Sequence, residues 1–182
     1  MNIDMITQFV GFITKVDPET FIEEWELYNK RLGNKKSESI LLELFHSSCR
    51  FKYISLHHST QFDLFFNFMK GRNSDQFASH NVKVVQAGGY MLRENDSKYD
   101  QSNESDKLIV FIADNKINQD IFKEYPFYHM NIYEPYYESC SYTTIIELFA
   151  DPKNADDLVK SINKIPGVES GIYRQCVLSH HK

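Results

Sequence analysis

The residues best suited to acid–base chemistry lie in the segment from Arg50 to Met69, RFKYISLHHSTQFDLFFNFM. Its first part alternates as a β-strand does, so Tyr53 and His57 share one face. Histidine is the side chain whose ordinary pKa suits a base near neutral pH. His57 is therefore the first candidate for a base, with Tyr53 beside it. The alternative is that His57 closes a strand end and does no chemistry.

Further candidates come from two neighbouring segments. Trp25 and Tyr28 belong to an apolar stripe at helical spacing that also contains Phe21 and Leu32, and His46 follows the next apolar strand. Indole and phenol groups combine an apolar face with a hydrogen-bonding atom, which suits a pocket for an aromatic compound. The same side chains also suit a plain hydrophobic core, and both interpretations stay open.

The spacing of the metal-binding residue types does not favour a metal site. His57 and His58 are adjacent on a strand and point to opposite faces, so they cannot hold one ion together. His46 and Cys49 flank a turn but supply only two ligands. The three cysteines are too few and too scattered for a disulfide framework, and no base accompanies any of them. We expect no metal, no cofactor and no cysteine nucleophile.

Composition and charge exclude several classes of partner. The chain has 182 residues, of which 42% are hydrophobic and 25% charged, and its net charge is −5. No run of lysine and arginine is longer than a pair, so nucleic acid is not an expected partner. No window approaches 18 apolar residues, so we expect a cytoplasmic protein without a membrane span. The 14% of aromatic residues suits an aromatic-lined cavity, a dimer interface or an aromatic-rich core.

The elements that would position these residues follow a β-α-β-β-α-β order in the first half. Asp17 and Pro18 begin a helix as N-cap and first residue, and Gly88 and Gly89 indicate a bulge in the last strand. This order is the ferredoxin-like arrangement. The predicted strands are 9–16, 39–45, 51–58 and 82–93, and the predicted helices are 18–32 and 62–69.

A polar segment, ENDSKYDQSNESD at 94–106, predicts a linker between a first domain at 1–93 and a second at 107–182. The second half begins a helix at Asp151-Pro152 and holds at most a short helix at 118–129, because Pro126 disfavours one there. Its last strand repeats a Gly–Tyr pattern of the first half, which indicates a diverged internal duplication. Pairing the two Asp-Pro helix starts instead would shift the repeat register, and that alternative stays open. The second-half strands are predicted at 107–113, 133–138, 142–149 and 168–178.

The helix ETFIEEWELYNKRL, the hairpin LLELFHSSCRFKYISL and the run from STQFDLFFNFM to SHNVKVVQAGGYMLRE resemble the antibiotic biosynthesis monooxygenase domain family over residues 9–93. The second half resembles that family only in its last three elements. The resemblance implies an α+β protein with tandem ferredoxin-like (βαββαβ) repeats that form a dimeric-type α/β barrel. The barrel would close within one chain or between the two chains of a homodimer. None of the motifs is catalytic, so they bear on fold more than on activity.

Cofactor-free oxygenases of that family act on electron-rich aromatic substrates, in which a base removes a phenolic proton and the anion reacts with dioxygen. The resemblance therefore implies a cofactor-independent monooxygenase-like protein for a small aromatic or polyketide-like ligand. His57 would be the base, and Tyr53, Trp25, Tyr28 and His46 would surround the pocket.

Two alternatives to this chemistry stay open. One is a non-catalytic ligand-binding or assembly module of the same fold, for which the tyrosine-rich segment 128–142 is suited. The other is haem degradation, in which relatives use an asparagine on the first strand and a histidine on the second helix. The segments FVGFITKV and STQFDLFFNFM lack these two residues, so haem ranks third.

Overall fold

The computed structural model describes residues 6–31, 38–46, 49–59, 82–97, 105–136 and 140–180. The helix expected at 62–69 lies outside these residues. In chain order the elements are β1 (Ile6–Ile13), α1 (Pro18–Arg31), β2 (Glu38–His46), β3 (Tyr53–Ser59), β4 (Lys83–Ser97), β5 (Asp106–Ile112), the 3-10 helix η1 (Gln119–Glu124), β6 (His129–Pro135), β7 (Thr144–Ala150), α4 (Pro152–Ile162) and β8 (Val168–His180).

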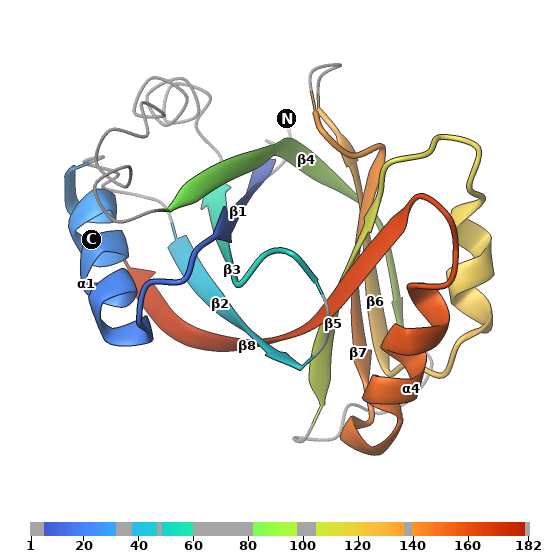
Figure 1. The fold of residues 1–182 in the computed structure, drawn as a ribbon. Helices are drawn as coiled ribbons and strands as arrows, with labels where there is room; N and C mark the ends of the chain where they lie inside the picture. The colour runs from blue at the N-terminus through green and yellow to red at the C-terminus, as the bar shows by residue number, and fades with distance from the viewer. Residues whose placement is uncertain are drawn as a thin grey trace.

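The eight strands of the described residues form one closed antiparallel barrel in the order β1-β3-β2-β8-β5-β7-β6-β4 (Figure 1). The first half contributes β4-β1-β3-β2, and the second half contributes β8-β5-β7-β6. The halves join edge to edge through the β2–β8 and β4–β6 pairs. The barrel therefore closes within one chain, and its two halves share a single hydrogen-bonded sheet.

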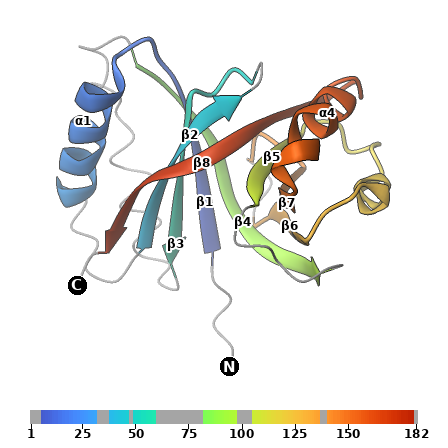
Figure 2. The ribbon, with the colours of Figure 1, turned by 90° about the horizontal axis from the view of Figure 1, so that it is seen from below.

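Helices cover the outside of the barrel on opposite flanks. α1 lies against the first-half strands, while α4 and η1 lie against the second half (Figures 1 and 2). Alternation along β3 separates the two faces of the wall. Tyr53 packs with Phe21 and Trp25 of α1, whereas Ile54 and Leu56 belong to the cluster inside the barrel. The outer face of β3 thus carries the side chains that matter for the site.

The inside of the barrel contains an aromatic core. Phe9 meets the rings of Tyr90 and Tyr133 edge to face, at centroid distances of 5.6 and 5.2 Å. A buried carboxylate, Glu147, accepts a hydrogen bond from the Tyr133 hydroxyl at 2.5 Å and pairs with Lys107 at 3.1 Å. An aromatic-rich core, one of the three explanations for the aromatic content, therefore accounts for these residues.

Both helix starts predicted from the Asp-Pro pairs are confirmed. The Asp17 carboxylate accepts the N–H of Thr20 at 3.0 Å at the start of α1. The Asp151 carboxylate accepts the N–H of Lys153 at 2.9 Å at the start of α4. Each carboxylate satisfies a backbone donor that the first helical turn leaves open. Local sequence alone therefore defines these two boundaries.

The bulge predicted at Gly88 and Gly89 is also present. Phe9 pairs with Gly88 and Val10 with Gln86, so the extra residue of the bulge is Ala87, directly before this pair. Gly88 has a φ of +121°, and a Cβ there would lie 2.5 Å from the sulfur of Cys140. Glycine is thus needed for both backbone conformation and space.

One segment differs from expectation, and the short helix expected within 118–129 is present. Residues Glu94–Ser97, placed in the expected linker at 94–106, continue β4 and pair with β6. Polar side chains are compatible with a strand whose outer face meets water, so composition could not reveal this extension. The region at 118–129 forms the six-residue 3-10 helix η1, which ends before Pro126. Proline lacks the N–H that a longer helix would use there.

Candidate functional site

Strand pairing collects polar side chains in one corner of the sheet beneath α1. His57 of β3 lies opposite Gln8 of β1 on one side and opposite Ser39 of β2 on the other. Ser55 lies two residues along β3 and therefore on the same face. His57 is 5% exposed, and Ser39 and Ser55 are fully buried. The corner is thus a buried polar cluster in the layer between helix and sheet.

A continuous hydrogen-bond chain runs through this corner. The Trp25 indole Nε1 donates to Ser55 Oγ at 2.9 Å, and Ser55 Oγ lies 2.7 Å from His57 Nε2. On the other side of the ring, His57 Nδ1 lies 2.8 Å from Ser39 Oγ. A neutral imidazole satisfies all of these contacts when Ser55 donates to Nε2 and Nδ1–H donates to Ser39. Nε2 is then the basic nitrogen, reached through a serine hydroxyl.

The helix contributes Trp25 and Asn29, which are four residues apart and so lie on one side of α1. Asn29 Nδ2 donates to the Trp25 carbonyl oxygen at 3.0 Å. Asn29 Oδ1 and Gln8 Nε2 are buried, and neither makes a hydrogen bond with the described residues. Buried polar atoms normally have partners. The layer therefore keeps one acceptor and one donor available for a ligand.

Tyr53 lies in the same layer, toward the other end of β3. Its ring stacks on Phe21 with centroids 4.2 Å apart. Its hydroxyl is buried and meets no hydrogen-bond partner among the described residues, although Glu43 is directly opposite in the strand register. Burial, followed by the nearby Glu43 carboxylate, raises the pKa of Tyr53. Tyr53 thus stays protonated at neutral pH and is a donor, not a base.

The structure brings together three of the five predicted site residues. Trp25, Tyr53 and His57 share the layer under α1. His46 ends β2 at the opposite end from Ser39, and seven residues of extended strand separate the two by roughly 23 Å. The fifth residue, Tyr28, lies in α1, but its side chain is outside the described part of the chain.

Four site residues were missed by the sequence analysis: Gln8, Asn29, Ser39 and Ser55. Two of them carry a local signal. Ser55 lies between Tyr53 and His57 in the alternation, and Asn29 follows Trp25 by one helical turn. Gln8 and Ser39 become site residues only through the pairing of β1 and β2 with β3. Finding them requires the strand register, which one sequence does not specify.

The corresponding layer of the second half is filled by apolar side chains. A cluster from β5 to β8 packs against η1 and α4 there, with Phe122 and Phe127 fully or almost fully buried. Of the ten buried polar or charged residues in the described part, five lie in the first-half layer. The buried polar side chains of a helix–sheet layer are therefore concentrated in the first half.

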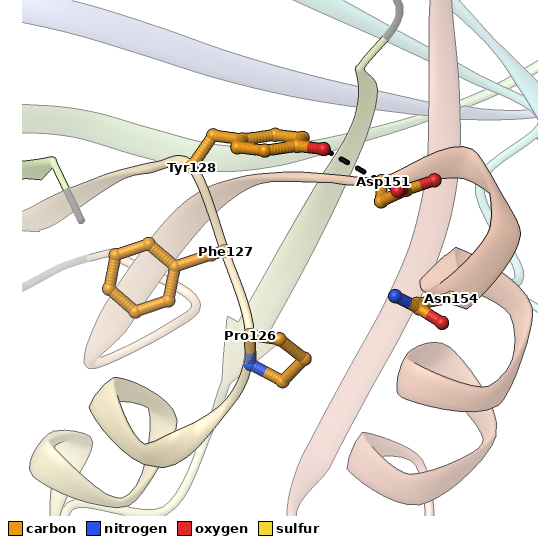
Figure 3. Close-up of a pocket in the computed structure, with 5 residues that line it drawn as sticks. All are labelled: Pro126, Phe127, Tyr128, Asp151 and Asn154. Carbon is orange, nitrogen blue, oxygen red and sulfur yellow. Dashed lines mark hydrogen bonds between the residues drawn. The ribbon is translucent and has the colours of Figure 1, made fainter. Parts of the chain in front are cut away.

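A separate hollow of about 250 Å³ opens beside the start of α4 (Figure 3). Its lining residues are Pro126, Phe127, Tyr128, Asp151 and Asn154. The Tyr128 hydroxyl donates to Asp151 Oδ2 at 3.5 Å, and the other carboxylate oxygen caps the helix. None of the lining residues is a histidine, and the carboxylate is already engaged. This hollow offers no base near neutral pH.

Metal-ligand clusters and thiols are the other groups that could form a site in the described ranges. No group of three or more histidine, cysteine, aspartate or glutamate residues there could hold a metal ion. Burial raises the pKa of both Cys49 and Cys176 to about 11. Both stay thiols near neutral pH, so neither has the thiolate a nucleophile needs.

Among the described residues, none of the helices combines the length and the apolar composition that a membrane span requires.

Comparison with known proteins places the fold. No protein-family model matches the chain, and no curated protein matches its sequence. A “Putative monooxygenase” from Fusobacterium nucleatum subsp. nucleatum ATCC 25586 is similar in structure, with a TM-score of 0.53 and 13% identity over 98% of this chain and 95% of that one. An anthrone oxidase-like protein gives a TM-score of 0.58 and 10% identity over 98% and 94%.

A chlorite dismutase variant from Candidatus Nitrospira defluvii gives a TM-score of 0.56 and 8% identity, over 93% of this chain and 91% of that one. The chain has a dimeric α/β-barrel fold. Because these neighbours share so little sequence and carry different activities, the likeness establishes the fold alone. The narrower resemblance to antibiotic biosynthesis monooxygenases stays a prediction.

Proposed function

We propose that this protein is a cofactor-independent, monooxygenase-like enzyme for a small phenolic or polyketide-like aromatic compound, with His57 as its base. The observation that carries the proposal is the hydrogen-bond chain Trp25–Ser55–His57–Ser39 in the first-half layer. It puts the imidazole of His57 in a buried environment, where proton transfer and charge stabilisation are effective. The monooxygenase and anthrone oxidase-like names of two structural neighbours support the choice of substrate class.

Proton removal in this site runs through a serine, because hydroxyl groups cover both ring nitrogens. As Ser55 passes its proton to His57 Nε2, its oxygen accepts the proton of the substrate hydroxyl. The Trp25 N–H already donates to that oxygen and stabilises the charge that develops on it. The unpartnered amide N–H of Gln8 is available to bind the resulting phenolate. The phenolate is then the electron-rich species that reacts with dioxygen.

We also infer that the halves, residues 1–93 and 107–182, are tandem ferredoxin-like repeats. The strand orders β4-β1-β3-β2 and β8-β5-β7-β6 support this, since each is the same circuit of first, second, third and fourth strand. Tyr90 on β4 and Tyr173 on β8 both belong to the cluster inside the barrel. The repeats have then diverged, with proton-transfer groups kept in the first and apolar packing in the second.

Oxygen uptake across a panel of anthrones and phenols tests the enzyme. The variant His57→Gln should lower kcat by roughly 10²- to 10⁴-fold, the range for loss of a positioned general base. The matched control is His58→Gln, since His58 is adjacent but hydrogen-bonds Thr7 at 2.9 Å on the other face of β3. His58→Gln should retain uptake. Equal uptake by wild type and His57→Gln rejects the base, and no uptake by wild type with any substrate rejects the enzyme.

A ligand-binding module without turnover is the second candidate. It is favoured by the 5% exposure of His57 and by the serines that engage both of its ring nitrogens. Trp25 is the only tryptophan in the sequence, so tryptophan fluorescence reports on this layer alone. Quenching by an anthrone without oxygen uptake would assign binding; quenching with uptake would assign the enzyme.

A further inference from the structure

A second group of polar and aromatic side chains lies on the outer wall between the two helix-covered flanks. β2 and β8 pair there, and in Figure 2 β8 crosses between α1 and α4. The two strands line a hollow of about 350 Å³, here called the seam hollow. Its lining residues are Glu43, Leu44, Phe45, Arg174, Gln175 and Cys176. Small-molecule sites in proteins begin at about this size.

The seam hollow contains a flat stacking surface. Phe45 is 52% exposed, which is unusual for a phenylalanine, and the Arg174 guanidinium carbon lies 3.3 Å from its ring centroid. Arg174 also donates to Asp106 Oδ1 at 3.3 Å, and Asp106 is buried. A guanidinium held between a ring and a carboxylate is fixed in orientation. Phe45 and Arg174 therefore present a preformed surface for a planar ring.

Hydrogen-bonding groups lie at the edge of this surface. Glu43 lines the hollow and pairs in register with Tyr53, whose buried hydroxyl has no partner among the described residues. Glu43 and Cys176, which also lines the hollow, both act electrostatically on Tyr53. Tyr53 itself is fully buried beneath α1 and does not line the hollow. The hollow thus offers one carboxylate acceptor, Glu43, to a ligand hydroxyl that donates.

The charges near the hollow select among aromatic ligands. Glu43 and Asp106 are acidic and Arg174 is basic, so the three side chains sum to −1. This net negative charge repels an anionic aromatic compound and allows a neutral one to bind. A phenol keeps its proton near neutral pH, as tyrosine does. Its hydroxyl can therefore donate to Glu43 while its ring stacks on Phe45.

We propose that the seam hollow is a second binding site, specific for neutral hydroxylated aromatic compounds. It is distinct from the His57 layer. Glu43 and Ser39 are four residues apart on β2, roughly 13 Å of extended strand, and the fully buried Leu41 lies between them. A ligand in the hollow therefore does not reach the imidazole, and the hollow is occupied whether or not His57 supports turnover.

Modification of Cys176 provides a local readout, because the Cys176 side chain is exposed and lines the hollow. Partial desolvation raises the pKa of its thiol to about 11, so the reaction is slow near neutral pH, and the readout is the ratio of the rates without and with ligand. The rate of its reaction with a thiol reagent is measured in a Cys140→Ser background, in which Cys49 is buried. The probe is 2-naphthol, with 2-naphthoate as the anionic compound of the same ring. At a 2-naphthol concentration about five times its Kd, only about one sixth of the molecules have an empty hollow. The modification rate of Cys176 should therefore fall about sixfold, because Cys176 reacts only in those molecules.

The variant Phe45→Ala should abolish protection by 2-naphthol. Leu92→Ala, which truncates another exposed apolar residue, should keep it. Arg174→Lys keeps the positive charge but removes the planar guanidinium, so this variant should also lose protection by 2-naphthol. It replaces Phe45→Ala as the test if that variant fails to fold. His57→Gln should be protected like wild type, which separates this site from the proposed enzyme. No protection of wild type, protection of Phe45→Ala, or equal protection by 2-naphthoate would overturn the proposal.

Discussion

The hydroxyl of Tyr53 allows a test in which removing a polar group should stabilise the protein. Tyr53 is fully buried, and its hydroxyl has no hydrogen-bond partner among the described residues. A buried polar group left unsatisfied costs about 1–3 kcal/mol. Tyr53→Phe removes this group and retains the ring that stacks on Phe21. The free energy of unfolding should therefore rise by about 1–3 kcal/mol, and each kcal/mol should raise Tm by about 2–4 °C in a chain of this length.

Tyr90 supplies the matched control, because its side chain is equally buried but hydrogen-bonded. Its hydroxyl donates to the carbonyl oxygen of Tyr142 at 2.9 Å and accepts the N–H of Tyr142 at 3.2 Å. Tyr90→Phe leaves both backbone groups without that partner. It should lower the free energy of unfolding by about 1–3 kcal/mol. The same chemical change is thus expected to have opposite signs at the two positions.

Urea unfolding followed by Trp25 fluorescence and circular dichroism measures both variants. If Tyr53→Phe is destabilised as much as Tyr90→Phe, the Tyr53 hydroxyl has a partner in the folded protein. That result would refute the assignment of the Tyr53 hydroxyl as an unsatisfied buried group.

Three further outcomes are expected. Gly88→Ala should lower the free energy of unfolding by more than about 2 kcal/mol, because a Cβ at this position has a strained positive φ and lies too close to the Cys140 sulfur. Thermal unfolding measures the change, and an unchanged Tm would contradict the bulge geometry. Glu169→Ala should lower the free energy of unfolding in urea by about 1–2 kcal/mol. Glu169 accepts the backbone N–H of Arg50 at 2.9 Å and pairs with the Arg50 guanidinium at 3.2 Å. An unchanged free energy of unfolding would show that this link between the halves is not stabilising. Hydrogen bonds from Thr20 lower the pKa of Asp17 below its ordinary value of 3.8. The stability that ionised Asp17 contributes is therefore complete above pH 3.8 and is lost as the pH falls through the lower pKa of the folded state. Asp17→Asn should weaken the dependence of stability on pH in that window, and an unchanged acid-unfolding curve would argue against the cap.

Local patterns predicted more of the fold than of the site. The N-caps at Asp17 and Asp151, the bulge at Gly88 and the placement of His57 beside Tyr53 on one face depend on neighbours in the chain, so one sequence reveals them. The extension of β4 through Glu94–Ser97 depends instead on an available edge in β6. Its polar composition indicated a linker because side-chain pattern carries no information about which edge is unpaired.

By itself the sequence determined the hydrophobic periods of its strands and helices and where the two Asp-Pro helices begin. It also determined that His57, Trp25 and Tyr53 belong to the first half. Tertiary structure decided the rest. The pairing of β1 and β2 with β3 put Gln8 and Ser39 beside His57. The pairing of β2 with β8 also brought Arg174 onto the half-exposed ring of Phe45. These pairings join residues far apart in the chain, and their geometry depends on how all eight strands close together, which no local pattern specifies.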